Sequence, residues 1–149
     1  MPSTYAHYRM GQEVIKQVSV PAHDIIMKHK QLYDIGLHGP DILFYYHPLV
    51  TNPVNAIGYG LHERSGKYFF GKAAEIIETA SDKEAALAYI YGFICHFALD
   101  STCHGYIDEK IVQSGVSHTE IEVEFDRSLM IEDGKDPVRQ DLTKHIVPS

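Results

Sequence analysis

The feature that most constrains the fold is the helical segment that begins near residue 82. Ser81-Asp82-Lys83-Glu84 is typical of a capped helix start, and the chain is apolar nearly all round from Ala85 to Leu99. A helix that is hydrophobic on every side lies in the middle of a bundle. Gly92 within it costs about 1 kcal/mol relative to Ala, which suggests that a neighbouring helix approaches closely. We therefore expect a bundle built around this helix, which should continue through Cys103.

The same helix carries side chains that ligate metals. His96, Asp100 and, if the helix lasts that long, His104 follow one another at steps of four, and His118 and Glu122 repeat the step downstream. Four residues along a helix return to within about 40° of the starting direction, so each set shares one face. A buried Asp100 is costly unless it is paired or bound to a cation. The pattern predicts a metal site, the alternative being chance placement in a chain with ten histidines.

The remainder of the chain also predicts helices, so the expected fold class is all-α, a single-domain bundle of six or seven helices. Ser117 with Glu120 is typical of a helix cap. His23 and His29 are six residues apart, a spacing that does not stack on a helix, and both are interpreted as surface residues. We expect one domain over residues 1–132 and a polar tail or loop over residues 133–149. The expected helices before the central one cover residues 3–18, 22–36, 53–63 and 67–80.

Composition excludes several classes of partner and compartment. The formal net charge of −7, without a basic run, argues against a nucleic-acid partner. No signal peptide is visible, and no apolar run is long enough to span a membrane, so a cytoplasmic location is expected. Cys95 and Cys103 would lie about 12 Å apart on one helix, too far to bridge, and are interpreted as free thiols. A homo-oligomer is left open.

Together these residues resemble a known family. In order they are His7, Asp41 in a Gly-Pro-Asp, His62, the H-x-x-x-D-x-x-x-H of His96, Asp100 and His104, and the H-x-x-x-E of His118 and Glu122. The order and spacing, over about Ser3 to Arg127, are similar to those of the zinc-dependent prokaryotic phospholipase C family, whose fold the S1/P1-type nucleases share.

The resemblance implies an all-α fold around a buried cluster of up to three zinc ions. Asp41, His62, His96 and Asp100 would hold one zinc; Asp100 would bridge to a second, completed by His7 and the N-terminal residue. His104, His118 and Glu122 would hold the third.

The implied function is a metal-dependent phosphodiesterase acting on a phospholipid head group or another small phosphate ester. Asp41 is the candidate general base or water-orienting carboxylate, with Glu122 second. Tyr59 is a candidate aromatic wall for a choline-like group, with plain packing as the alternative. An S1/P1-like nuclease and a non-catalytic metal-binding protein are the alternative functions.

The sequence departs from the secreted members of that family. They expose an N-terminal tryptophan whose amine and carbonyl ligate zinc, whereas this sequence has no Trp, and removal of Met1 would leave Pro2 at the terminus. We also expect no C-terminal membrane-binding domain of the kind that those members carry. The family domain usually continues beyond a position equivalent to Ser149, which would leave part of a pocket lid outside this sequence.

Overall fold

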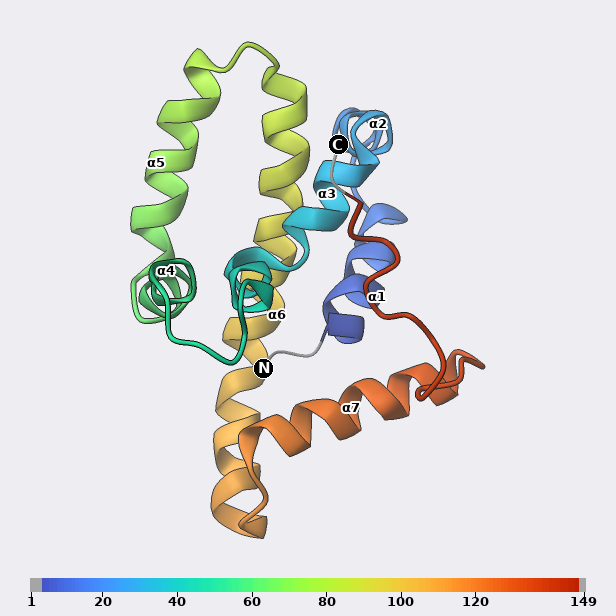
Figure 1. Ribbon diagram of the computed structural model, residues 1–149. Coiled ribbons are helices and arrows are strands. Elements are labelled where there is room, and N and C mark those ends of the chain that lie inside the picture. Colours follow the sequence, from blue (N-terminus) through green and yellow to red (C-terminus); the bar gives the residue numbers. More distant parts are fainter. Residues whose placement is uncertain (1–3, 148–149) are drawn as a thin grey trace.

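The structure is a computed structural model that describes residues 4–147, and every regular element in that range is a helix (Figure 1). This confirms the predicted all-α bundle. In chain order the elements are α1 (Thr4–Ile15), α2 (Val20–Lys28), α3 (Lys30–Gly36), the 3-10 helix η1 (Gly39–Tyr45), α4 (Pro53–His62), α5 (Gly66–Thr79), α6 (Lys83–Ser114) and α7 (His118–Glu132). Within residues 4–147 no helix is both long and apolar enough to cross a bilayer.

Helix α6 is the axis of the molecule. In Figure 1 it runs the full height of the bundle, with α5 beside its upper part, α1 to α3 on the other side, and α7 leaving from its lower end. Asp82 caps its start, since Oδ1 accepts the Ala85 N–H at 2.9 Å. The residue that terminates it, directly after Ser114, is Gly115, whose φ of 71° is the left-handed conformation that favours glycine. The helix therefore extends well past Cys103 and includes His104.

Two glycines allow α3 to pack directly against α6. A Cβ on Gly92 would lie 2.2 Å from the carbonyl oxygen of Tyr33, and one on Gly36 would lie 2.2 Å from that of Tyr89. The predicted close approach at Gly92 is thus confirmed, and α3 is the neighbour. Tyr33 is fully buried at this contact, and its hydroxyl donates to the carbonyl of Gly11 at 2.9 Å. The contact fixes η1, which follows α3, against the middle of α6.

The prediction of one continuous helix over residues 22–36 is wrong. The segment is divided into α2 and α3 at His29, which has φ −121° and ψ 42°. Both short helices contact α6, and this bend lets them do so. The interpretation of His29 as a surface residue is also wrong, because its side chain is only 17% exposed and its Nε2 lies 4.0 Å from Oδ1 of Asp82. His23 is exposed, as expected.

The segment after α7 consists of turns and returns along α1 (Figure 1). The Tyr5 hydroxyl donates to Oδ2 of Asp133 at 2.6 Å and accepts from the Lys135 ammonium at 2.6 Å. Further along, Nε2 of His145 lies 2.7 Å from Nε2 of buried His38. The segment is therefore attached to the bundle by polar contacts, while the predicted domain boundary at residue 132 stays a prediction.

Candidate metal centre

The structure brings the eight predicted ligand residues to one place beside the middle of α6. They come from five elements: His7 from α1, Asp41 from η1, His62 from the end of α4, His96, Asp100 and His104 from α6, and His118 and Glu122 from α7. Six of the eight line one cleft of about 290 Å³, and the other two, His7 and His96, lie behind it.

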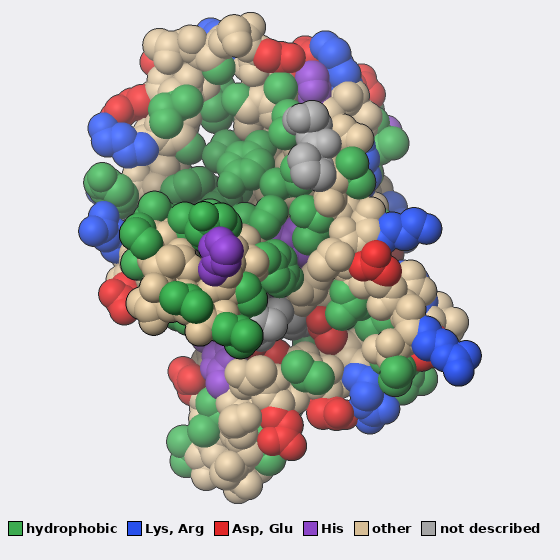
Figure 2. Space-filling view, viewed as in Figure 1, with side chains coloured by type: hydrophobic (Ala, Val, Ile, Leu, Met, Phe, Trp, Pro, Cys, Tyr) green, Lys and Arg blue, Asp and Glu red, His purple; other side chains and the backbone are tan. Residues whose placement is uncertain are grey.

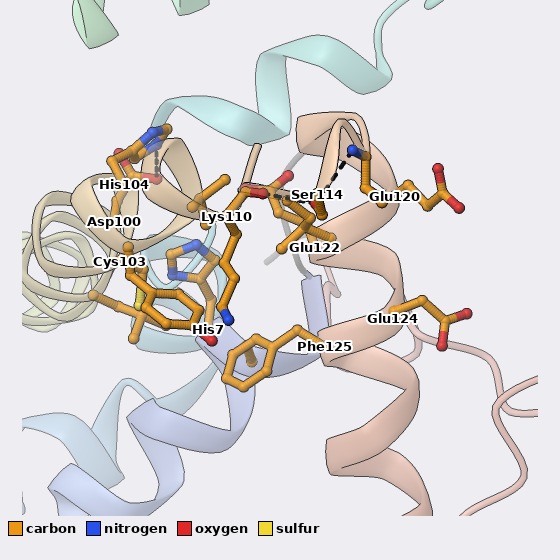
Figure 3. Close-up of a pocket in the computed structure, with 16 residues that line it drawn as sticks. His7, Asp100, Cys103, His104, Lys110, Ser114, Glu120, Glu122, Glu124 and Phe125 are labelled. Atoms are coloured by element: carbon orange, nitrogen blue, oxygen red, sulfur yellow. Dashed lines mark hydrogen bonds and ion pairs between the residues drawn. The ribbon is translucent and has the colours of Figure 1, made fainter. Parts of the chain in front are cut away.

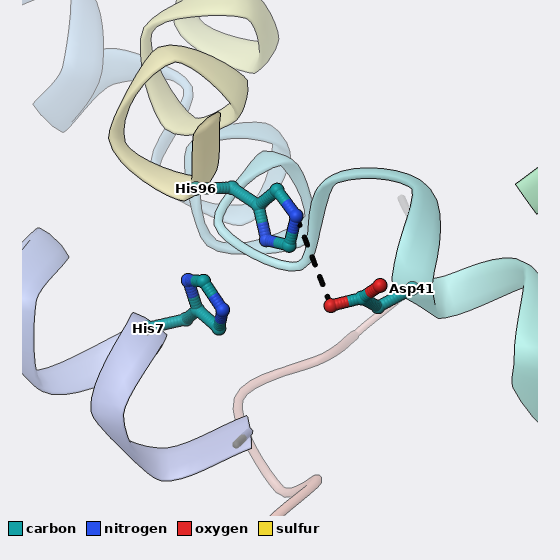
Figure 4. A group of neighbouring side chains, drawn as sticks. All are labelled: His7, Asp41 and His96. Carbon is teal, nitrogen blue, oxygen red and sulfur yellow. Dashed lines mark ion pairs between the residues drawn. The ribbon is translucent and has the colours of Figure 1, made fainter. Parts of the chain in front are cut away.

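Three of the residues form a buried group, which we call the inner cluster: His7, Asp41 and His96 (Figure 4). One ligating atom from each lies within 4.8 Å of the others. The rings of His7 and His96 stack with their centroids 4.2 Å apart. Oδ2 of Asp41 faces Nε2 of His96 at 3.7 Å, so the carboxylate approaches the imidazoles without a direct hydrogen bond. The three side chains point toward one another from α1, η1 and α6.

The polar atoms of this group test whether a cation fits. Oδ2 of Asp41, Nε2 of His96 and Nδ1 of His7 are buried without a hydrogen-bond partner, and so is Oε2 of Glu122 on α7. A buried polar group left unpaired costs about 1–3 kcal/mol, and more when charged. Several such atoms in one place are rare in a stable protein unless something binds them. Imidazole nitrogens and carboxylate oxygens are the ligands that zinc takes, so the residues fit that ion.

His62 is oriented for ligation by its own helix. Its Nδ1 donates to the carbonyl of Gly58 at 2.8 Å, so Nε2 is left facing Oδ1 of Asp41 at 2.9 Å. A carbonyl partner on one ring nitrogen is how metal-binding histidines commonly fix their tautomer. His62, His96 and Asp100 make a second group of ligating atoms within 4.8 Å, which overlaps the inner cluster at His96.

The remaining residues form two pairs, which we call the outer pairs. Nε2 of His104 lies 3.0 Å from Oδ1 of Asp100 on α6, and Nε2 of His118 lies 2.9 Å from Oε1 of Glu122 on α7. The two imidazole rings are 5.1 Å apart, so the pairs face each other across the helix junction. Asp100 was expected to be buried, but its side chain is 21% exposed because it lies at the cleft wall.

Electrostatics in the metal-free site favour neutral histidines inside and a charged one at the edge. Burial, with a smaller contribution from neighbouring histidines, lowers the pKa of His7 and of His96 to about 3. Burial raises the pKa of Asp41 to about 6, against the opposing contact with His62. That contact raises the pKa of His62 to about 9. The inner imidazoles thus keep lone pairs free for a cation near neutral pH.

One residue that sequence reasoning missed holds His7 in place. Asp126 of α7 accepts two backbone N–H groups from the first turn of α1, those of Tyr5 at 2.9 Å and Ala6 at 2.8 Å. Those donors have no partner within the helix, and a carboxylate there also complements the helix dipole. A signal existed, because Asp126 continues the four-residue step of His118 and Glu122 along α7.

The cleft wall includes the predicted aromatic residue. Tyr59 is 62% exposed, packs on Phe44 with ring centroids 4.7 Å apart, and lines the cleft together with Pro48 and Asn55. The N-terminal residue, expected as a ligand, lies outside the described residues.

Exposed apolar side chains lie on α4 and on the loop before it, elements that also contribute Pro48, Asn55 and Tyr59 to the cleft. Figure 2 shows hydrophobic groups gathered over α4 and the loop before it. Tyr46, Leu49, Val50 and Ile57 are each more than half exposed there, and Leu49 is 97% exposed. The elements that supply part of the cleft wall therefore also carry an exposed apolar surface.

Comparison with known proteins gives one family. A family model described as zinc dependent phospholipase C matches residues 6–148, which is nearly the whole chain and includes all eight candidate ligands. Searches of curated proteins and of solved structures give no significant match. The buried cluster of unpaired imidazole and carboxylate atoms agrees with what such a family requires. The chain belongs to the zinc-dependent phospholipase C family.

Proposed function

We propose that the protein is a zinc-dependent phosphodiesterase that hydrolyses the head-group ester of a phospholipid, or a related small phosphate ester. The observation that carries the proposal is the set of buried, unpaired ligand atoms at the base of a cleft that a substrate can enter. The family is one of hydrolases, and its model covers every candidate ligand.

We assign the ligands as three sets. Asp41, His62, His96 and Asp100 are proposed for the first zinc, His7 with Asp100 for the second, and His104, His118 and Glu122 for the third. The two groups of atoms within 4.8 Å support the first two sets, although His7 groups with Asp41 and His96 rather than with Asp100. The facing rings of His104 and His118 support the third. Bound zinc would lower the pKa of a coordinated water to about 7 and offset the charge of phosphate oxygens.

The chain's own residues then position the reactants. Asp41 lines the cleft, and its pKa is raised by burial, so it can accept a proton from the attacking water near neutral pH. That role requires a weak contact to any cation, because a tight one would lower the pKa of the carboxyl again. Glu122 is the second candidate, since its Oε1 contacts His118 while Oε2 stays unpaired. Tyr59 is proposed to contact a quaternary ammonium head group at the cleft mouth.

The test combines metal content with activity. Purified protein from zinc-replete expression should contain about three zinc ions per chain and should hydrolyse phosphatidylcholine or p-nitrophenylphosphorylcholine. Chelation should abolish the activity, and added zinc should restore it. His118→Ala should lose activity, whereas His23→Ala, an exposed histidine outside the cleft, should keep it.

Other results separate the alternatives. Less than one zinc per chain would contradict the metal assignment. Full zinc content without hydrolysis of either ester would favour a non-catalytic metal-binding protein. Hydrolysis of single-stranded DNA alone would favour the nuclease, a function that the net charge of −7 does not support.

A further inference from the structure

One face of α6 is left uncovered by the other helices of residues 4–147. Its residues follow one another at steps of four, three, four and seven, which place them within about 30° of one line along the helix. We call this stripe the open face. Its residues, all exposed, are Ile94, Ala98, Ser101, Gly105 and Val112. Val112 is 86% exposed, and a Cβ on Gly105 would meet no atom within 4 Å.

The helices α3, α5 and α7 use other faces of α6. Helix α3 packs on Gly92, and α5 packs on Phe93 through a stacked aromatic ring. Toward α1 and α7, α6 borders a cavity of about 490 Å³ (Figure 3), to which it contributes side chains that include Asp100, Cys103, His104 and Lys110. No residue of the open face lines this cavity or the cleft.

An uncovered face differs from what the sequence of this helix predicts. The chain is apolar nearly all round from Ala85 to Leu99, as in a helix that is surrounded by others. In the structure, however, Ile94 and Phe97 remain 45% and 42% exposed. One side of α6 therefore lacks a neighbour.

The total surface of the chain gives the same indication. The chain exposes 9368 Å² to solvent, whereas a folded monomer of 16.8 kDa exposes about 7,700 Å². The excess, about 1,700 Å², is larger than the area of about 800 Å² that each partner buries in an interface of standard size. The exposed area is therefore large enough for a stable interface with a second copy.

The open face and its flanks are complementary to themselves when the direction of the helix is reversed. The N-terminal part carries large apolar side chains, Leu87, Ile90, Tyr91 and Ile94, and the C-terminal part carries small ones, Ala98, Ser101, Thr102 and Gly105. An antiparallel pair whose twofold axis passes at the level of His96 places Ile94 opposite Ala98 of the second copy. The same axis places Leu87 opposite Gly105. Large side chains against small ones let two helices pack closely.

The polar side chains of this surface also suit such a contact. The hydroxyls of Ser101 and Thr102 donate to carbonyl oxygens of their own helix at 2.6 and 2.7 Å, so burying them leaves no unpaired donor. Exposed Lys83 lies near the start of α6, and exposed Asp108 and Glu109 lie near its end. The antiparallel pair brings Lys83 opposite Glu109 at both ends. A parallel pair would place like charges opposite each other, which is unfavourable.

We propose that the open face is the interface of a homodimer, in which α6 packs antiparallel against α6 of a second copy. Such an interface is isologous, since the same surface of both copies meets across the twofold axis. Asp100 lies about 120° around the helix from Ile94, so the dimer leaves the cleft free. The inference goes beyond the proposed function and does not depend on it.

The experiment measures the mass of the full chain, purified from zinc-replete expression, by sedimentation equilibrium. At micromolar concentration the mass should be about 34 kDa, twice the 16.8 kDa of one chain. Ser101→Glu should raise the dimer Kd by at least about 100-fold, because each copy would bury an unpaired carboxylate. Ser128→Glu adds the same charge at an exposed serine of α7 and should leave the mass unchanged. Circular dichroism and zinc content equal to those of the parent chain verify that both variants are folded.

Charge reversal tests the antiparallel arrangement. Lys83→Glu and Glu109→Lys should each raise the dimer Kd by about tenfold, and the double variant should restore it, because opposite charges then meet again. The mass of a single chain at every concentration of the parent would overturn the proposal. A dimer that Ser101→Glu leaves intact would overturn the assignment to the open face, and a double variant that is not restored would overturn the antiparallel pairing.

Discussion

The inner cluster and the outer pairs use the same residue types in different surroundings. His7, Asp41 and His96 are each at most 5% exposed and keep buried atoms without partners. His104 and His118 are 41% and 35% exposed, and each already contacts a carboxylate on its own helix. We expect burial to make the first group more dependent on a cation for folding, and exposure to leave the second accessible to substrate. Loss of an inner imidazole should therefore reduce mainly stability, and loss of an outer imidazole mainly activity.

The largest expected effect separates these two contributions directly. His96→Ala should cost about 3–5 kcal/mol of unfolding free energy, because it removes a fully buried imidazole and leaves Oδ2 of the buried Asp41 carboxylate without the ring that faces it. His118→Ala should cost about 1 kcal/mol, because its side chain is partly in solvent, yet it should lower kcat/KM by at least about 100-fold. Urea denaturation of both zinc-loaded variants, with His23→Ala as control, measures the difference. Equal losses of stability would show that the two groups do not differ.

The second-largest expected effect is a loss of stability of the metal-free protein on acidification. Burial lowers the pKa of His7, His96 and nearby His38 to about 3 in the folded state, so between pH 6.5 and 3 the unfolded chain binds more protons. Each histidine should therefore cost about 2 kcal/mol of stability on going from pH 7 to pH 5. Asp41 and His62, whose pKa values are raised, oppose the change more weakly.

The net result is a fall in the Tm of metal-free protein by roughly 10 °C between pH 7 and 5, measured by calorimetry after chelation and desalting. His38→Asn removes one contribution without touching a candidate ligand and should make the pH dependence shallower. A Tm that stays constant or rises over this interval would contradict the buried, neutral state of these histidines.

The smallest expected effect is at the rim of the cleft. Tyr59→Ala should raise KM for a choline ester by about two- to fivefold with little change in kcat, because an exposed cation–π contact is worth about 0.5–1 kcal/mol. Tyr59→Phe keeps the ring and should behave like the parent. Steady-state kinetics with a matched ester that lacks the quaternary ammonium provide the control. The same loss with both esters would mean that Tyr59 only packs against Phe44.

Regular spacing made much of this arrangement predictable. His96, Asp100 and His104 share a face because a helix repeats every 3.6 residues, and Gly92 indicated the contact with α3. Contacts between different helices show no such periodicity in the sequence. The rings of His104 and His118 face each other because of the way α6 and α7 pack. The bend at His29 likewise depends on the packing of the two short helices that it separates.

The residues that support the site were harder to find for the same reason. Asp126 acts on α1 from the far end of the chain, and only the fold shows which N–H groups it reaches. Asp100 was expected to be buried because its helix is apolar, but the cleft opens beside it. A cavity forms where packed elements leave a gap between their side chains. The position of such a gap depends on the three-dimensional arrangement of the helices, which sequence periodicity does not give.

The hydrogen bonds from Tyr5 and Ala6 to Asp126 have a consequence for folding order. They join residues 121 and 120 positions apart, which makes them among the most sequence-distant contacts in the chain. Closing so long a loop is slow, and contacts of this kind form late. Because α1 is synthesised before α7, the hydrogen bonds that hold the first turn of α1, and with it His7, form only after Asp126 has been made. Zinc capture by the complete centre is therefore a late step, and a nascent chain shorter than about 126 residues should hold the metal weakly.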